Sequence, residues 1–305
     1  MKNLFSVDGK VVIVTGGGKG VGRGITLRFL EAGAQVVICG RSAPEELPRV
    51  DDREAHFIAC DVRDYAQIEA CVEETVSRHG RLDVLVNNAG GAPHADAATA
   101  SPRFSEAIIR LNLIAPLNFS QVANRVMQEQ EDGGSIINIA SVSTIRPSPG
   151  TAAYGAAKAG LVNLGTSLAV EWGPKVRVNA LVVGLTVTEQ AHMHYGDDEG
   201  IAAVGATIPL GRMAVPEDVG NACLFLGSDL ASYVSGTNFA VHGGGLRQHW
   251  ARGGDSTACA AAGCGGARCG QPPAAGCGSS RTSATPSRSM SCRGRRSTPN
   301  RPLTS

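Results

Sequence analysis

The sequence predicts an α/β fold in which helices cover both faces of a single parallel sheet. Short apolar runs rich in β-branched residues, such as residues 10–15 (Lys-Val-Val-Ile-Val-Thr), alternate along the chain with segments of helical apolar spacing. Alternating strands and helices form parallel sheets, and a strand covered on both faces is apolar throughout. The first 246 of the 305 residues are enough for one large core, and a hydrophobic content of 43% fits a soluble globular protein.

The predicted elements follow one another regularly. A strand at 10–15 leads through a glycine-rich loop into a helix at 24–32. The later elements are strands at 35–39 and 56–60, a helix at 65–79, a strand at 82–86 and a last strand at 238–241. Polar residues follow two of these strands, as Asp61-Val62 and as Asn87-Asn88-Ala89-Gly90. Ligands of such sheets bind beyond the carboxyl ends of the strands, so these residues are candidates for ligand binding.

The glycine-rich loop joins the first strand to the first helix. It places three glycines in the order Gly16-x-x-x-Gly20-x-Gly22, with Lys19 and Val21 between them. Glycines let the backbone approach a pyrophosphate, and the helix N-terminus offers free N–H groups, so the loop predicts a dinucleotide-phosphate cradle. The spacing is not G-x-G-x-x-G, and the alternative is a glycine turn that binds no ligand.

The second strand ends at Gly40-Arg41, where an NAD-binding site usually offers an acid to the ribose 2′-hydroxyl. Arg41 can instead pair with a 2′-phosphate, assisted by Lys19. We therefore expect NADP as the cofactor, with NAD as the alternative.

The most informative pattern is Tyr154-Gly-Ala-Ala-Lys158, with Ser141 thirteen residues upstream. Side chains at i and i+4 of a helix share a face, so a phenol and an ammonium can enter the same cleft. A nearby positive charge lowers a phenol pKa and suits the tyrosine to acid–base work, while the Ser141 hydroxyl can hold a substrate oxygen. The alternative is a surface tyrosine that packs on a lysine stem.

Together these motifs resemble the short-chain dehydrogenase/reductase family, in its branch with one domain of about 250 residues. The resemblance extends from about residue 5 to about residue 246, and the motifs occur in the family's order and spacing: Thr15-Gly16 through Gly22, Asp61-Val62, Asn87 to Gly90, Asn112, Ser141, Tyr154 and Lys158. The resemblance implies a Rossmann-like, doubly wound sheet. It also implies hydride transfer between a nicotinamide and a secondary alcohol or ketone, in a homo-oligomer that is a dimer or tetramer.

The resemblance implies a role for each matching residue. Tyr154 exchanges a proton with the substrate oxygen, Lys158 holds the nicotinamide ribose and lowers the tyrosine pKa, and Ser141 hydrogen-bonds the reacting oxygen. Asn112 stabilises a bend in its helix. The remaining cofactor contacts fall on Asp61, Val62, Asn88, Ala89, Gly90 and Thr188. One departure is Val183-Gly184, where the family often has Pro-Gly, and we expect it to alter loop stiffness more than activity.

Residues 251–305 differ in composition from the rest of the chain. They lack Val, Ile, Phe, Tyr and Trp, and eight arginines against the single Asp255 give them a net charge of +7, so residues 1–250 carry −6 of the total of +1. Such a segment cannot bury enough apolar surface to offset its ordering entropy, and we expect a disordered tail after a catalytic domain at 1–250. We interpret it as read-through or frameshifted coding, with an RNA-binding arm or a cysteine metal module as alternatives.

Other features limit the class of protein. No N-terminal apolar segment or membrane-length apolar run is present, so we expect a cytoplasmic enzyme with no membrane or nucleic-acid partner. Cys39, Cys60, Cys71 and Cys223 are interpreted as separate buried hydrophobes in a reducing compartment, and no metal site is predicted.

The substrate is the least determined feature. The segment at 185–213, with His192 and His194, is expected to close over it, and residues 91–94 and 146–149 are expected to form the other walls. We favour a hydroxyacyl thioester or a steroid-ring fragment, as in actinobacterial relatives. The alternatives are a cofactor-binding regulator without turnover, and an epimerase or dehydratase, which would need a packed C-terminal domain.

Overall fold

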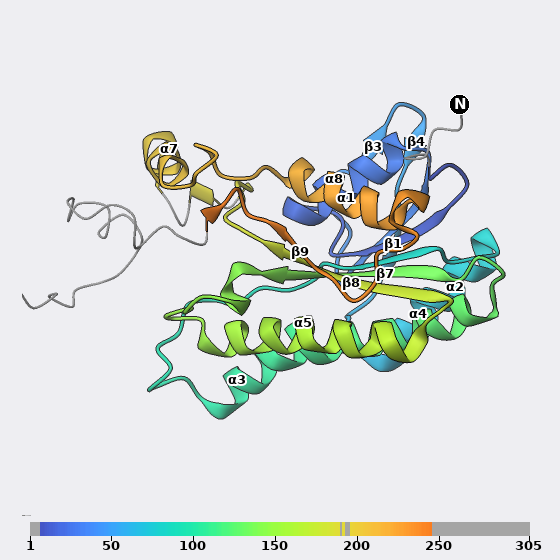
Figure 1. Cartoon of the computed structure of the whole chain (residues 1–305), viewed down its shortest axis with the longest axis horizontal. Coiled ribbons are helices and arrows are strands. Elements are labelled where there is room, and N and C mark those ends of the chain that lie inside the picture. The colour runs from blue at the N-terminus through green and yellow to red at the C-terminus, as the bar shows by residue number, and fades with distance from the viewer. Residues whose placement is uncertain (1–6, 190, 193–195, 246–305) are drawn as a thin grey trace, which may run out of the picture. The chain divides into compact units, whose positions relative to one another are not determined.

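The computed structural model describes residues 7–245 except 190 and 193–195. Seven parallel strands form its main sheet in the order β5-β2-β1-β6-β7-β8-β9 (Figure 1). Their bounds are β1 Val11–Thr15, β2 Gln35–Gly40, β5 His56–Ala59, β6 Val84–Asn87, β7 Gly134–Ser141, β8 Val176–Val183 and β9 Asn238–Val241. The chain runs outward from β1 to β5 and then returns to β6, so the direction of winding reverses between β1 and β6. Ligands of doubly wound sheets bind in the crevice at this reversal.

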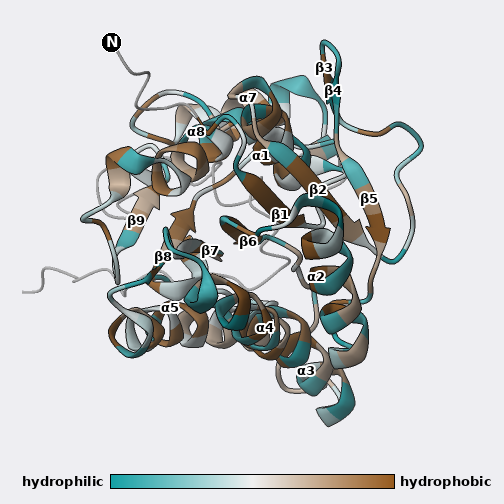
Figure 2. Cartoon of the chain, turned by 90° about the vertical axis from the view of Figure 1, so that its right-hand side faces the viewer, coloured by the Kyte–Doolittle hydropathy of each residue, from teal (hydrophilic) through white to brown (hydrophobic). Residues whose placement is uncertain are grey.

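Helices cover both faces of the sheet (Figure 2). On one face lie α1 (Gly20–Glu31) and α8 (Pro216–Gly227), and on the other α2 (Tyr65–His79), α4 (Ala115–Glu129) and α5 (Ala152–Trp172). Alternate strand residues face opposite layers: Val12 packs with Phe29 of α1, whereas Ile13 packs with the cluster that includes Phe119 of α4. Because both faces are buried, every residue of β1 is apolar or fully enclosed, as the sequence predicted.

The predicted fold class is confirmed, and most predicted bounds agree with the structure within one or two residues. The clearest difference is α1, which begins at Gly20 and not at Gly24. Lys19 is still extended, with φ −151° and ψ 165°, and Gly20 has φ +52°, so the chain turns into the helix inside the glycine loop.

Several elements carried no clear sequence signal. A short hairpin pairs β3 (Arg49–Val50) with β4 (Arg53–Glu54). Helix α3 (Pro102–Ile109) continues through a π-helical turn at Arg110–Ile114 into α4, and α7 (Asp198–Ala206) lies in the segment predicted to cover the substrate. Within the described ranges, no helix has the length and apolarity that a membrane span requires. The predicted boundary at residue 250, the tail at 251–305 and His194 lie outside the described residues.

Candidate active site

Ser141, Tyr154 and Lys158 lie together at the carboxyl edge of the sheet. Ser141 is the last residue of β7, and Tyr154 and Lys158 lie in the first two turns of α5. Because position 183 is valine and not proline, β8 continues to that residue and pairs Val183 with Ser141 on one side and Val241 on the other. The Ser141 hydroxyl donates to Ser143 Oγ and accepts from the Ser143 N–H, both at 3.2 Å, so its orientation is set by its own turn.

Lys158 is fully enclosed, with 3% of its surface exposed. Its ammonium donates to the Ile139 carbonyl at 2.8 Å and lies 5.7 Å from the centre of the Tyr154 ring. Burial lowers the pKa of Lys158 to about 8, because an ammonium loses its hydration inside the protein. The Lys158 ammonium thus lies beside the ring of Tyr154, but its burial there makes it easier to deprotonate.

The pKa of Tyr154 differs from the expectation. Burial raises it above the usual value, because the phenolate is the charged form, and the nearby Ser141 hydroxyl acts in the opposite direction. The predicted net lowering of the Tyr154 pKa is wrong, because burial has the largest effect on it. The ammonium faces the ring of the tyrosine, and its own proton is weakly held.

Asn112 lies in the π-helical turn, fully buried. Its amide nitrogen donates to the carbonyls of Ile108 and Gly91, and its amide oxygen accepts from the Gly91 N–H, all at 2.9 Å. The side chain therefore ties the distorted helix to the loop after β6, in keeping with the expected role at a bend. A Cβ on the adjacent Gly90 would come within 2.6 Å of Asn112 Oδ1 and 3.1 Å of Lys158 Nζ, so only glycine fits between them.

The ends of β1 and β6 are joined by hydrogen bonds through Thr15, which sequence reasoning placed in a motif without a role. Its hydroxyl accepts from the N–H groups of Asn88 and Ala89 at 2.9 Å, and the Asn88 amide donates back to the Thr15 carbonyl at 2.9 Å. These bonds fix the loop after β6 beside the glycine loop, at the winding reversal where a dinucleotide is expected.

The glycine loop requires glycine at two of its positions. Gly16 has φ +66°, and a Cβ on Gly22 would lie 2.2 Å from the Gly16 carbonyl oxygen. The close approach of backbone to backbone thus requires glycine at both positions. Val21 lies in the first turn of α1 and packs against the core on that face of the sheet.

The segment after β2 brings the predicted cations to the same edge. Pro44 lies against Gly18, so this segment borders the glycine loop, and Lys19 and Arg41 are both exposed there. Asp61 binds Arg63 through two bonds of 2.9 and 2.6 Å, and Arg63 with Arg41 holds the pKa of Asp61 at about 2. Val62 is buried beside it. The ionised Asp61 is therefore already paired with Arg63, whereas the described residues offer Arg41 no ion pair.

Thr188 lies over the glycine loop, and its neighbour Glu189 was missed by sequence reasoning. A Cβ on Gly20 would lie 3.5 Å from the Thr188 methyl group. The Glu189 carboxylate accepts from the Gly20 N–H, at 3.3 and 3.2 Å for its two oxygens. An N–H group at a helix N-terminus is an anion site, so Glu189 lies where we expect the cofactor pyrophosphate.

Replacement of Glu189 by glutamine should tighten cofactor binding by about three- to tenfold, or roughly 0.7–1.4 kcal/mol, because it removes a negative charge beside the pyrophosphate position. Fluorescence titration with NADPH measures the dissociation constant. The matched control is Glu199→Gln, at an exposed position in the first turn of α7. Equal effects of the two substitutions would contradict a specific competition at Gly20.

A small cavity beside Tyr154 is lined mostly by small and apolar side chains. Its volume is about 70 Å³, and its wall includes Ala92, Pro93, Phe104, Ile108, Gly150 and Ala153. The two loops expected to form walls meet here, since the Ala95 N–H donates to the Gly150 carbonyl at 2.8 Å. In the segment at 185–213, the described His192 contacts the Gly196 carbonyl at 3.0 Å and lies 4.0 Å from Asp198.

A doubly wound sheet with this glycine loop, and with a serine, tyrosine and lysine at its carboxyl edge, defines a nicotinamide-dependent oxidoreductase. Residues 16–245 match the family model described as enoyl-(acyl carrier protein) reductase. The chain belongs to the short-chain dehydrogenase/reductase family, and it is an NAD(P)-dependent oxidoreductase of alcohols and ketones.

Named relatives share most of the chain. A 3alpha-hydroxysteroid dehydrogenase of Mediterraneibacter gnavus is 38% identical over 248 residues, which cover 79% of this chain and 98% of that protein. A 3-oxoacyl-[acyl-carrier-protein] reductase of Thermotoga maritima is 35% identical, covering 78% and 98%. Among solved structures, the aldohexose dehydrogenase of Thermoplasma acidophilum has a TM-score of 0.74 at 30% identity, covering 82% and 98%.

Proposed function

We propose that this protein is an NADP(H)-dependent dehydrogenase/reductase that interconverts a secondary alcohol and its ketone on an apolar substrate. The observation that carries the proposal is the convergence of Ser141, Tyr154 and Lys158 at the carboxyl edge of the sheet, with Tyr154 also bordering a small, largely apolar cavity. The glycine cradle and the close approach at Gly90 fit a dinucleotide, whose nicotinamide supplies or accepts the hydride when bound.

The chain's own residues handle the proton and the oxygen. In ketone reduction, Tyr154 donates its phenolic proton to the oxygen that becomes the alcohol, and its raised pKa keeps that proton available at neutral pH. The Ser141 hydroxyl donates to the same oxygen as negative charge develops there. The Lys158 ammonium stabilises the phenolate that remains. In alcohol oxidation each of these transfers runs in reverse.

The substrate class that we propose is a hydroxysteroid or a hydroxyacyl thioester. The apolar wall beside Tyr154 supports both, and the two named relatives act on these classes by their names. The test is a panel of hydroxysteroids, β-hydroxyacyl thioesters and sugar alcohols, each assayed with NADP and NAD through the absorbance of the reduced nicotinamide. Preference for a sugar alcohol would overturn the apolar-substrate proposal and leave the reaction class intact.

We propose NADP as the preferred nucleotide because Lys19 and Arg41 border the expected position of its 2′-phosphate. Arg41→Asp should weaken NADP binding by about ten- to a hundredfold, since a charge-assisted contact is worth roughly 1.5–3 kcal/mol. Titration of wild type and variant with each nucleotide measures the effect. Arg78→Asp, an equal charge change at an exposed position in the last turn of α2, is the control. Tighter NAD than NADP binding by wild type would contradict the preference.

We also propose that residues 1–250 are the catalytic domain, in a dimer or tetramer. Val170 of α5 and Leu210 are 82% and 73% exposed on the single chain, and their burial between subunits would support an oligomer. Deletion of residues 251–305 should leave the melting temperature, the turnover and the number of subunits per oligomer unchanged, because the last strand of the described residues ends at Val241, before the deleted segment. Calorimetry and light scattering test this, and a large fall in melting temperature would show that the tail stabilises the domain.

A further inference from the structure

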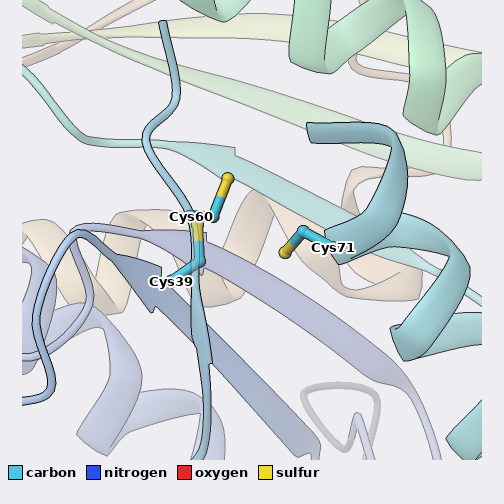
Figure 3. Close-up of side chains that lie close together, drawn as sticks. All are labelled: Cys39, Cys60 and Cys71. Atoms are coloured by element: carbon cyan, nitrogen blue, oxygen red, sulfur yellow. The ribbon is translucent and has the colours of Figure 1, made fainter. Parts of the chain in front are cut away.

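Three cysteines that are far apart in the sequence meet inside the molecule. Cys39 lies near the end of β2, Cys60 directly follows β5, and Cys71 lies in α2. Figure 3 shows the three side chains close together, and the three sulfur atoms all lie within 4.8 Å of each other. Each residue is at most 2% exposed, and none forms a disulfide. The sequence indicated these cysteines only as separate buried hydrophobic residues.

The fold fixes this meeting point. Strands β2 and β5 are parallel neighbours, with Cys39 opposite Ile58, and the Cys60 N–H donates to the Gly40 carbonyl at 2.9 Å. Helix α2 then packs Cys71 onto the same face through Ile68 and Val72 of the shared core cluster. Because β5 is the edge strand of the main sheet, the cluster lies on the side of the core nearest that edge.

The triangle of sulfurs has the dimensions of a three-coordinate metal site. Metal–thiolate bonds of about 2.3 Å place three sulfurs of a planar trigonal site about 4.0 Å apart. A triangle with sides of at most 4.8 Å therefore needs each sulfur to move inward by about half an ångström or less, as estimated from the same bond length. Small rotations of the cysteine side chains suffice for such a shift.

The three thiols also shift the pKa values of one another. Hydrogen bonds from Cys39 and Cys71 lower the pKa of Cys60 to about 4, whereas the pKa of Cys39 and that of Cys71 are raised. A thiolate is the form that binds metal.

We propose that Cys39, Cys60 and Cys71 form a trigonal site for a soft, monovalent metal ion of the Cu(I) class. Thiolates select soft ions, and among these zinc takes four ligands. Within the described ranges, no histidine, carboxylate or further cysteine joins the three sulfurs as a fourth ligand. A fully buried three-sulfur site therefore suits an ion that is stable with three ligands. Binding forms copper–sulfur bonds and releases the displaced thiol protons to solvent, with no change of oxidation state.

The test uses the full chain with the five tail cysteines (Cys259, Cys264, Cys269, Cys277 and Cys292) changed to serine, because free thiols there also bind Cu(I). Anaerobic titration with Cu(I) against a colorimetric Cu(I) chelator should show one ion bound per chain. X-ray absorption of the loaded protein should show three sulfur neighbours. Cys71→Ser in the same background should weaken Cu(I) binding by at least about 100-fold, because it removes a direct ligand. Loss of a residue that only hydrogen-bonds a ligand already weakens metal binding by about 10- to 100-fold.

Cys223→Ser is the matched control, since Cys223 is a buried cysteine of α8 outside the cluster. It should leave the Cu(I) affinity unchanged, and circular dichroism verifies that each variant is folded. The proposal is overturned if the folded background protein loses all Cu(I) to the chelator, or if Cys71→Ser and Cys223→Ser bind Cu(I) equally well. A coordination shell of two sulfurs overturns it independently of any variant.

Discussion

Tyr154→Phe should reduce kcat by about 100- to 10,000-fold, the range that general acid–base groups contribute, while the cofactor dissociation constant stays within a few-fold. The substitution removes one oxygen and keeps the ring that the Lys158 ammonium faces, so the architecture is preserved. Steady-state kinetics in both directions, with a separate NADPH titration, measure the two effects.

The control for this prediction is Tyr65→Phe. Tyr65 also loses a phenolic oxygen, one that accepts from Arg125 at 3.3 Å on the outer surface of α2 and α4. Its turnover should match wild type. If Tyr154→Phe retains more than about a tenth of wild-type kcat, the assignment of Tyr154 as the acid–base group fails, and another donor must protonate the substrate oxygen.

Local pattern was sufficient to predict the parts of the site that lie within one element. The interval of four residues between Tyr154 and Lys158 is one helical turn, so their shared face follows from α-helix geometry alone. The same holds for the strand–glycine–helix order at residues 10–32. Ser141 required only that a strand end at its position, and the apolar run before it indicated this.

Features that depend on tertiary packing could not be predicted in this way. Glu189 lies 169 positions from Gly20 in the sequence, and nothing in its neighbourhood indicates a contact with the glycine loop. The three-cysteine cluster needs the pairing of β2 with β5 and the docking of α2, which single-element periodicity does not contain. The predicted sign of the Tyr154 pKa shift was wrong for a similar reason. Proximity in sequence placed a charge nearby, but burial proved the dominant effect.

Lys158→Met should make the stability of the protein less dependent on pH. In the folded chain the pKa of Lys158 is about 8, below the usual 10.5, so the unfolded chain binds more protons between these values. Wild-type stability therefore rises with pH from about 8 to 10.5, and below pH 8 the full cost of the buried ammonium is present. Since methionine does not titrate, the free energy of unfolding of the variant minus that of wild type should fall by roughly 3 kcal/mol between pH 7 and pH 10.5.

Urea unfolding at a series of pH values measures this difference. Loss of the hydrogen bond to the Ile139 carbonyl costs the variant about 1–3 kcal/mol at every pH. This cost lowers its free energy of unfolding by a constant amount and does not change how that free energy depends on pH. Lys175→Met is the control, because the exposed Lys175 ammonium also donates to main-chain carbonyls, those of Gln128 and Gln130. If both variants show the same dependence on pH, burial of Lys158 is not its cause. If only Lys158→Met removes the dependence and also abolishes turnover, the lysine reduces stability because its position under Tyr154 serves the reaction.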